Sequence, residues 1–472
     1  MRKKNHSLII PDLVVALLTL AFITAGALVS INRFWQYEVF YYDFGIFDQA
    51  LWKVAHFSPP IIEHLVVGGK IIFADHFNPS IFILSPLYWL TEKQEIMLIA
   101  QAAIVGLSGI ILYLIGNQVL KNKFQSLAVT VSYFLFTGLQ NAVITDFHEV
   151  TIATVALMLV YLAIVKKNII WYWILLFIML GFKESNFLVG FGVGISLFFL
   201  NRQWAKTALL TCIISLLYGF LTIKLFIPYF AGEPYQYGVP IDPNPVVFFS
   251  SFVDNPIKLR TLFFSFASFG FLPLLSPALW FLIFQDFTTR FYSPSWALRF
   301  DLGMHYSALL SVILALSSIF SVNFLNKKLN NRKPFIYLIL SLLIVNSFFL
   351  YRFVLHGPLA LAYNPAFYEN TKNFMFLEQA VSKIPKNASI ATQNDLLSHF
   401  THQPSWLLKT IDDRAEYILL DVREGQNPNN YWGLGSLQDI KTMLKTIQGN
   451  QNYALYYQNG DVYIFQRLSK EK

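Results

Sequence analysis

Charged side chains are scarce in this chain, and their scarcity excludes most classes of soluble protein. Of the 472 residues, 13% are charged, whereas 55% are hydrophobic and 17% are aromatic. A soluble domain carries about 25% charged residues, so this chain has roughly half the charge that a water-facing surface needs. Disorder requires low hydrophobicity and high charge, and is excluded as well. The composition therefore indicates a membrane protein.

Cysteine is almost absent, which excludes a disulfide-stapled fold. Cys212 is the only cysteine, and it lies within an apolar run. One thiol cannot form an intramolecular bridge, so the fold must be stabilised in another way. The chain also shows no internal repeat and no low-complexity segment.

Long apolar runs indicate membrane-spanning helices. Residues 13–31 carry no charge and follow Arg2, Lys3 and Lys4. The run is too long for the apolar part of a signal peptide and has no small-residue cleavage pattern before Trp35, so we expect an uncleaved first span. Further runs, of which several are short, lie at about 96–120, 124–145, 150–165, 169–182, 186–200, 205–230, 261–275, 279–292, 306–325 and 334–352. The sequence predicts an all-α polytopic bundle of about eleven transmembrane helices over residues 1–352.

Basic residues lie in alternate loops and predict the orientation. These residues are Lys121, Lys123, Lys166, Lys167, Arg202, Lys206, Lys327, Lys328, Arg332 and Lys333. The positive-inside rule places these loops and the N-terminus in the cytoplasm of a cell-membrane protein. The net charge of +8 is then mainly a topology signal, and we expect no nucleic-acid partner. The opposite loops contain Asp43, Asp48, Glu63, His64, Asp75, His76, Asp146, His148, Glu149, Glu184, Asp242, Asp254 and His305.

The tail, residues 353–472, is polar and has no run of membrane length. An odd number of spans would place it outside the cytoplasm. Residues 388–392 and 416–422 are typical of strands, and residues 436–447 have helical periodicity. Residues 453–457 and 462–465 flank Asn459-Gly460, a strong hairpin signal. The sequence predicts a small extracytoplasmic α/β domain.

The segment Tyr41 to Trp52 is the most informative motif. Asp43 and Asp48 lie five residues apart in an otherwise apolar and aromatic stretch within the first outer loop, residues 32–95. We expect this stretch to form a helix along the membrane surface. Carboxylates at such a place are costly and therefore often functional. The alternative is that Asp43 caps the following helix and Asp48 faces water.

A second motif, Asp75-His76-Phe77-Asn78-Pro79, lies further along the same loop. Residues 61–64 and 70–73 bracket Gly68-Gly69 just before it and predict a hairpin. Adjacent Asp and His side chains can bind a divalent cation, or can act as a base and its orienting partner. The alternative is a local turn before the proline.

Three more elements follow on the same predicted side. The first two are Asp146-Phe147-His148-Glu149 and Lys183-Glu184. Lys183 can snorkel to the interface, or it can hold a phosphate while Glu184 connects it to the loop. The third is His305-Tyr306, which opens a span.

Arg290 and Arg299 lie near this third element and are candidates for phosphate contact. Ordinary interfacial anchoring is the favoured alternative for each of these residues taken alone.

Together these motifs resemble those of a prokaryotic family of polytopic membrane proteins of unknown function. The matching segments are Tyr42 to Gln49, Asp75 to Pro79, Pro86-Leu87-Tyr88, Phe147-His148, Lys183-Glu184, His305-Tyr306, Ile384 to Ile390 and Tyr417 to Asp421. The resemblance covers nearly the whole chain. Where the family has Lys-Glu-Asp, this chain has Ser185 at the third position, which puts a role for an acidic group there in doubt.

The family architecture is similar to that of the GT-C glycosyltransferases, which use polyprenyl-phosphate sugars at the outer face of the membrane. In that superfamily a carboxylate of the first outer loop is catalytic. The resemblance places this role on Asp43, with Asp48 second. It implies sugar transfer to an acceptor, with Asp43 as general base. Residues expected to bind substrate or phosphate are Asp75, His76, His148, Glu149, Lys183, Glu184, Arg290, Arg299 and His305.

Two other functions stay open from the sequence. A lipid or solute transporter would explain the many spans and Lys224 within one of them, although transporters usually place polar residues near the midplane of repeated halves. A non-catalytic membrane scaffold that presents the tail is also compatible. A divalent cation is a candidate cofactor, and the sequence does not indicate the oligomeric state.

Overall fold

Five apolar helical segments are long enough to cross a membrane. The computed structural model describes residues 10–62, 69–238, 244–292, 297–329, 332–411 and 414–468, so Arg2 to Lys4, Glu63, His64 and Asp242 lie outside the described residues. The five segments are Ile10–Trp35 (α1), Glu95–Leu120 (α3), Arg202–Ala231 (containing α9, Ala205–Leu221, and α10, Ile227–Ala231), His305–Lys328 (containing α14, Ala308–Lys328) and Lys333–Val354 (containing α15, Lys333–Phe349).

A bent pair of helices can be counted as a sixth span. Helix α4 (Lys123–Leu135) and helix α5 (Thr137–Ile144) meet at an angle of 51°. The bend falls at Phe136, whose backbone is extended with ψ 116°. The amide group of Gln140 donates to the Phe134 carbonyl at 2.8 Å. A broken helix inside a membrane protein needs such a bond, because no water is present to satisfy the freed carbonyl.

The remaining apolar helices in the first part of the bundle are short. They are α6 (Glu149–Val165), α7 (Ile169–Leu180) and α8 (Asn186–Leu200). The 12 residues of α7 extend about 18 Å, whereas the hydrocarbon layer is about 30 Å thick. By length and composition the described residues therefore contain five or six spans, and the predicted number of about eleven is not confirmed.

The predicted run 261–275 was wrong in extent, whereas the run 279–292 matches a helix to within one residue at each end. The structure has α11 (Pro245–Ser250), α12 (Pro256–Ala267) and α13 (Trp280–Phe291) in this region. After α12 the chain turns through Gly270 and Phe271, both with positive φ. Short 3-10 turns at Pro273 and Pro277 follow. Glycine in the left-handed region and proline both interrupt a helix, so the two apolar runs form short helices.

Helix α1 packs closely along α3. A Cβ atom at Gly26 of α1 would lie 3.2 Å from the Ala102 Cβ atom of α3 and 3.0 Å from a Val143 methyl group. Small residues permit this approach between membrane helices. The packing fixes the end of α1, from which the first outer loop begins.

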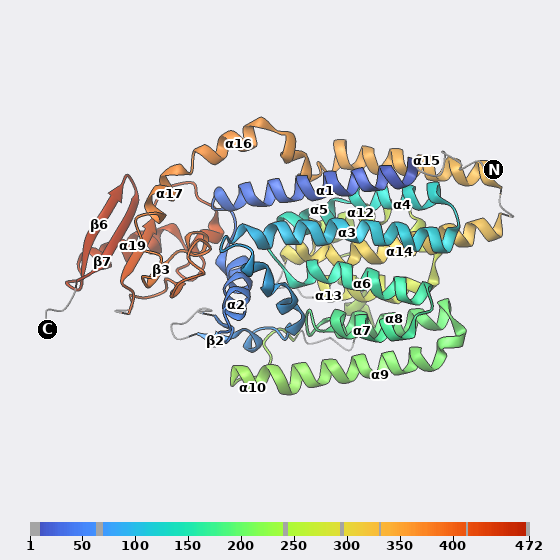
Figure 1. The fold of residues 1–472 in the computed structure, drawn as a ribbon, viewed down its shortest axis with the longest axis horizontal. Coiled ribbons are helices and arrows are strands. Elements are labelled where there is room, and N and C mark those ends of the chain that lie inside the picture. Colours follow the sequence, from blue (N-terminus) through green and yellow to red (C-terminus); the bar gives the residue numbers. More distant parts are fainter. Residues whose placement is uncertain are drawn as a thin grey trace.

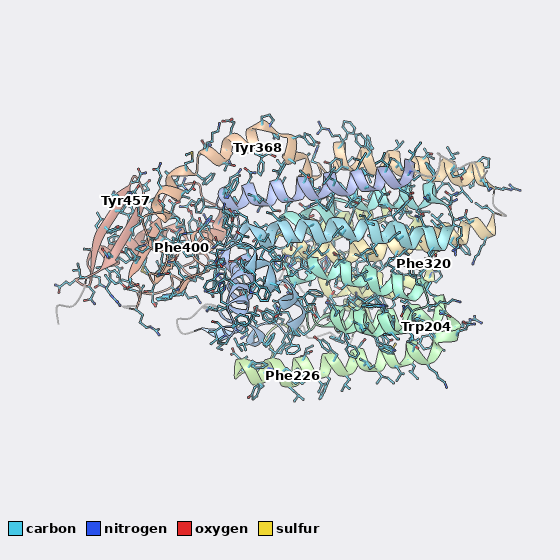
Figure 2. The ribbon with its side chains drawn as sticks, in the orientation of Figure 1. Trp204, Phe226, Phe320, Tyr368, Phe400 and Tyr457 are labelled. Atoms are coloured by element: carbon cyan, nitrogen blue, oxygen red, sulfur yellow. The ribbon has the colours of Figure 1, made fainter. Side chains whose placement is uncertain are left out.

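Figure 1 shows the N-terminus at one end of the bundle and the C-terminal sheet beyond the other end. Helix α2 (Ile46–Ala55) and the hairpin of β1 (Ile61–Ile62) and β2 (Lys70–Ile71) lie at the end next to the sheet. In Figure 2, Trp204 and Phe226 mark opposite ends of the 202–231 segment, and Phe400 lies where the tail meets the bundle. Strands β1 and β2 pair in antiparallel fashion, which confirms the predicted hairpin in the first outer loop.

The tail contains one five-stranded sheet with the order β4-β3-β5-β7-β6. The strands are β3 (Ile390–Thr392), β4 (Ser405–Leu407), β5 (Tyr417–Asp421), β6 (Tyr453–Asn459) and β7 (Val462–Arg467), and the helices are α16 (Pro365–Lys372), α17 (Met375–Val381), α18 (Asn394–Leu397) and α19 (Leu437–Gln448). Strands β3, β4 and β5 are parallel, and β6 and β7 form the predicted antiparallel hairpin. The turn contains Gly460 with φ +53°.

The sheet is covered on both faces by apolar clusters. Ile440 and Ile447 of α19 belong to one cluster, and Leu377 and Ala380 of α17 belong to the other. The second cluster also includes Tyr37, which lies just after α1. A residue of the membrane part is therefore built into the core of the tail.

Candidate functional site

Asp43 lies in a π-helical turn, η2 (Tyr41–Gly45), a few residues after α1. Neither η2 nor the following helix α2 has a side-chain cap, so Asp43 does not serve as a helix cap. Its side chain is 35% exposed. Single π-turns of this kind are frequent at functional sites. The structure therefore leaves the Asp43 carboxylate available to a ligand.

Asp43 faces a buried pair of stacked imidazole rings. Its Oδ1 atom lies 3.4 Å from Nε2 of His148, and the His148 ring stacks on His305 with 3.5 Å between the ring centroids. Gln101 fixes His148, because its Oε1 atom accepts the His148 backbone N–H at 2.9 Å. Burial opposes a charge on His148, but the facing Asp43 carboxylate raises the pKa of His148 above its ordinary value. A carboxylate and an imidazolium thus stabilise each other at this point.

Asp146 is a second acidic group beside this pair, and the sequence did not mark it as a separate candidate. It is buried, has a φ of +48°, and accepts the Phe40 backbone N–H at 3.5 Å through Oδ2. Its Oδ1 atom has no hydrogen-bond partner among the described residues. Burial, followed by the negative charge of Asp43, raises the pKa of Asp146 to about 7. Its position two residues before His148 was the only signal in the sequence.

Lys183 is paired rather than simply snorkelling. Its Nζ atom lies 2.7 Å from Oε1 of Glu149, whose side chain is almost fully buried. Burial opposes the charge of Lys183, but Glu149 and Glu184 together raise its pKa. The Lys183 side chain is 20% exposed. An ammonium group has three donors, so a lysine paired in this way can still donate to a ligand.

Glu184 binds the second motif of the first outer loop. Its Oε1 atom lies 2.8 Å from His76 Nδ1 and accepts the Tyr235 hydroxyl at 2.8 Å, while Oε2 accepts the Phe77 backbone N–H at 3.2 Å. Burial alone would raise the pKa of Glu184. The charges of His76 and Lys183 and the hydrogen bonds from His76 and Tyr235 instead lower it to about 2. The local-turn alternative for His76 is therefore wrong, since its partner lies 108 positions away.

Two tyrosines, Tyr237 and Tyr42, interact with the acidic residues of the first outer loop. The Tyr237 hydroxyl donates to Asp75 Oδ1 at 2.5 Å, and the Tyr237 ring stacks on His76. Burial and the charges of Asp75 and Asp43 raise the pKa of Tyr42 to about 12. Glu149, which follows His148, pairs with Lys183, and Glu184, which follows Lys183, pairs with His76. These contacts bring the Asp43 and Asp75 groups into one region, which we call the outer-loop site; it comprises Asp43, Asp75, His76, His148, Glu149, Lys183 and Glu184.

Asp48 lies outside this arrangement. It is 1% exposed, and its carboxylate accepts hydrogen bonds from the Tyr88 hydroxyl and, at 2.5 Å, from the Thr401 hydroxyl. His402 Nε2 lies 2.9 Å from Oδ2 of Asp48. Asp48 therefore neither faces water nor lies open to a substrate. It connects α2 to the tail.

The two arginines also differ from each other. Arg290 is buried, and it donates from Nε to the Arg299 carbonyl at 2.9 Å and from Nη2 to the Asp301 carbonyl at 2.8 Å. Its Nη1 atom lies 3.5 Å from Asp286. Arg290 thus holds the loop before α14 and is not presented to a phosphate. The Arg299 guanidinium lies 5.5 Å from the centroid of the ring of Tyr306, which follows His305 in the chain.

Metal ligands are not grouped in the described part of the chain. Within it, no three His, Cys, Asp or Glu side chains are arranged to hold a metal ion. The carboxylates of the outer-loop site are instead paired with His76, His148, Lys183 and tyrosine hydroxyls.

The fold and the site define a multi-spanning membrane protein that gathers carboxylates, imidazoles and a lysine in its loops and at helix ends. The chain belongs to the predicted membrane protein family DUF2079, whose model matches residues 33–463. Among solved structures it is similar to the crystal structure of ArnT from Cupriavidus metallidurans bound to undecaprenyl phosphate, with 9% sequence identity, a TM-score of 0.47 and coverage of 99% of each chain. No curated protein matches the chain.

Proposed function

We propose that this protein is a membrane glycosyltransferase of the GT-C type that moves a sugar from a polyprenyl-phosphate donor to an acceptor on the extracytoplasmic face. The observation that carries the proposal is the pair of Asp43 and His148. A partly exposed carboxylate lies 3.4 Å from a buried imidazole, in a π-helical turn shortly after the first long helix. A buried imidazole whose pKa is raised by a facing carboxylate is typical of sites that move protons.

In this mechanism Asp43 is the general base. It accepts the proton of an acceptor hydroxyl within hydrogen-bond reach, and His148 holds the carboxylate in place. The acceptor oxygen bonds to the anomeric carbon while the bond from that carbon to the phosphate oxygen breaks. Positive charge develops at the anomeric carbon, as in other glycosyl transfer, and the electron pair leaves with the lipid phosphate.

Lys183 and Arg299 are the proposed phosphate contacts. Lys183 is held by Glu149 and remains partly exposed, so it can stabilise the departing lipid phosphate. Arg299 offers a planar guanidinium near Tyr306. Asp75, His76 and Glu184 form a rigid hydrogen-bonded wall with Tyr237, which suits the positioning of a sugar.

The orientation of the chain is part of the proposal. The basic loops follow α3, α6, α8 and α14, whereas the site residues precede α6, α8 and α14 or follow α1. The positive-inside rule then places the site and the tail outside the cytoplasm. A lipid-linked donor reaches such a site from the bilayer, and an acceptor reaches it from the aqueous side.

The transporter alternative loses its main support. Lys224 was the intramembrane charge that favoured it, and the structure places this lysine on the exposed surface of the 202–231 segment. A transporter would place its polar residues near the midplane on broken helices. Here the polar residues lie in loops and at helix ends.

The test is sugar transfer in membranes that contain the wild-type protein or Asp43→Asn, with labelled polyprenyl-phosphate sugars as donors. Asp12→Asn is the matched control, because Asp12 is an acid in the first turn of α1 and pairs with Lys123 instead of a site residue. We expect transfer by the wild type and by Asp12→Asn, and loss of transfer in Asp43→Asn. Equal transfer by all three proteins would remove Asp43 from the mechanism.

A further inference from the structure

An exposed tryptophan of the tail lies directly over the residue that precedes Asp43. The Trp432 ring is 46% exposed, and its centroid lies 4.7 Å from that of Tyr42 at an interplanar angle of 47°. The Trp432 indole N–H has no hydrogen bond to any other described residue. Trp432 therefore presents an open aromatic face and an N–H donor next to Tyr42.

The loop that carries Trp432 is fixed to the candidate site by amide groups. The Tyr42 backbone N–H donates to Asn394 Oδ1 at 3.0 Å, and Asn394 Nδ2 donates to the Asn429 carbonyl at 3.0 Å. Asn427 Nδ2 donates to Glu38 Oε2 at 2.9 Å. The aromatic pair is therefore built in advance of any ligand, which reduces the entropy lost when a ligand binds.

We propose that Tyr42 and Trp432 form an acceptor subsite that stacks against the C–H face of a sugar ring; this inference rests on the proposed function. The face of an aromatic ring is electronegative, and the axial C–H bonds of a pyranose are its electropositive counterpart. Tyr42 is adjacent to Asp43 in the chain, and the charges of Asp43 and Asp75 both act on the Tyr42 hydroxyl. A ring stacked here presents a hydroxyl towards the base.

The position of the subsite favours the acceptor over the donor. Trp432 belongs to the tail, which lies beyond the end of the helical bundle, whereas a lipid-linked donor must arrive along the helices (Figure 1). The side chains that fix the loop are neutral amides except for Glu38. An uncharged carbohydrate acceptor suits this surface, and a phosphate group does not.

The first experiment measures acceptor kinetics for Trp432→Ala and Trp432→Phe with the full-length protein. We expect Trp432→Ala to raise the acceptor KM about tenfold, with little change in kcat or in donor affinity. Trp432→Phe retains an aromatic face and should recover most of this loss. Tyr456→Ala is the matched control, because Tyr456 is an exposed aromatic residue of the same domain on β6 that packs against Tyr417. An unchanged KM in Trp432→Ala would overturn the assignment.

A second experiment separates the subsite from the transferase proposal. Saturation-transfer NMR with methyl glycosides of glucose, galactose, mannose and N-acetylglucosamine measures binding without turnover. We expect signals from at least one glycoside with wild type and Asp43→Asn, and their loss with Trp432→Ala. Binding that depends on Trp432 without any sugar transfer would leave the subsite standing and refute the proposed function. The absence of any signal with wild type, or signals that survive in Trp432→Ala, would refute the subsite.

Discussion

Substitution of Asp48 by asparagine tests whether this residue positions the tail instead of taking part in chemistry. The Asp48 carboxylate is 1% exposed and meets Tyr88, Thr401 and His402. Leaving a buried hydrogen-bonding group unsatisfied costs about 1–3 kcal/mol. Asparagine keeps the shape but replaces one acceptor oxygen by a donor among Tyr88, Thr401 and His402, so we expect a cost at the upper end, about 3 kcal/mol.

Hydrogen exchange of the full-length protein in detergent measures this cost locally. The relevant amides are those of His399 and Phe400, which donate to the carbonyls of Leu396 and Leu397. When the segment opens and closes faster than the open amides exchange, about 3 kcal/mol corresponds to exchange that is about 100-fold faster. We therefore expect accelerated exchange across residues 398–402 in Asp48→Asn.

Two comparisons make the result decisive. Asp43→Asn should leave exchange across 398–402 unchanged, because the Asp43 carboxylate is partly exposed and pairs with His148. His402→Gln added to Asp48→Asn should cost little more, because both changes break the same contact between the two side chains. Slow, wild-type exchange in Asp48→Asn would refute the reasoning, and so would full additivity of the two changes.

Three further predictions concern the charges of the outer-loop site. Glu184→Gln should lower the free energy of unfolding by about 3 kcal/mol at pH 7, because the pKa of Glu184 is lowered from 4.5 to about 2. This stabilisation is present above pH 4.5 and is lost as the pH falls towards 2. Denaturation curves of the two proteins should therefore converge in acid. Asp146→Asn should stabilise the protein at pH 8 by roughly 2–4 kcal/mol and have little effect below pH 3.8. The pKa of Asp146 is raised from 3.8 to about 7, so the free-energy cost of this group in the folded state grows between pH 3.8 and about 7 and is complete above that; a constant difference in thermal stability at both pH values would contradict this. Lys183→Met should weaken binding of polyprenyl phosphate, measured by calorimetry, at least tenfold, while Lys224→Met, which changes an exposed lysine of the long 202–231 segment, should not.

The sequence predicted the tail better than the membrane part, and the reason is physical. The hairpin at residues 453–467 depends on alternating side chains and a glycine turn, which are local properties. Strand β5 was predicted from its apolar run and is buried at every position. Strand β4 was missed because three residues at a sheet edge carry too little pattern.

Span counting from apolar runs failed where turns interrupt them. The turn at Gly270 and Phe271 and the bend at Phe136 lie inside apolar stretches, so hydrophobicity alone does not mark them. A hydrophobic run reports burial in lipid or protein, but the length of a helix depends on where its backbone bonds stop. The number of long apolar helices is accordingly smaller than the number of runs.

The candidate site was only partly predictable. Asp43 and His148 were both marked by their motifs, but no rule of spacing connects positions 43 and 148. The pairing of His76 with Glu184 joins two loops separated by more than 100 residues, so only the fold reveals it. Asp48 was marked by the same reasoning as Asp43, since both are acids in an apolar segment. Their surroundings differ because Thr401 and His402 of the tail contact the Asp48 carboxylate, whereas Asp43 faces His148.

The most direct test of the central claim compares turnover with donor binding in Asp43→Asn. A general base contributes about 100- to 10,000-fold to a rate. We predict that Asp43→Asn lowers the kcat of sugar transfer by at least 100-fold, while the Kd for polyprenyl phosphate stays within twofold of the wild-type value. Wild-type turnover in Asp43→Asn, or a loss of activity fully explained by weaker donor binding, would contradict the account.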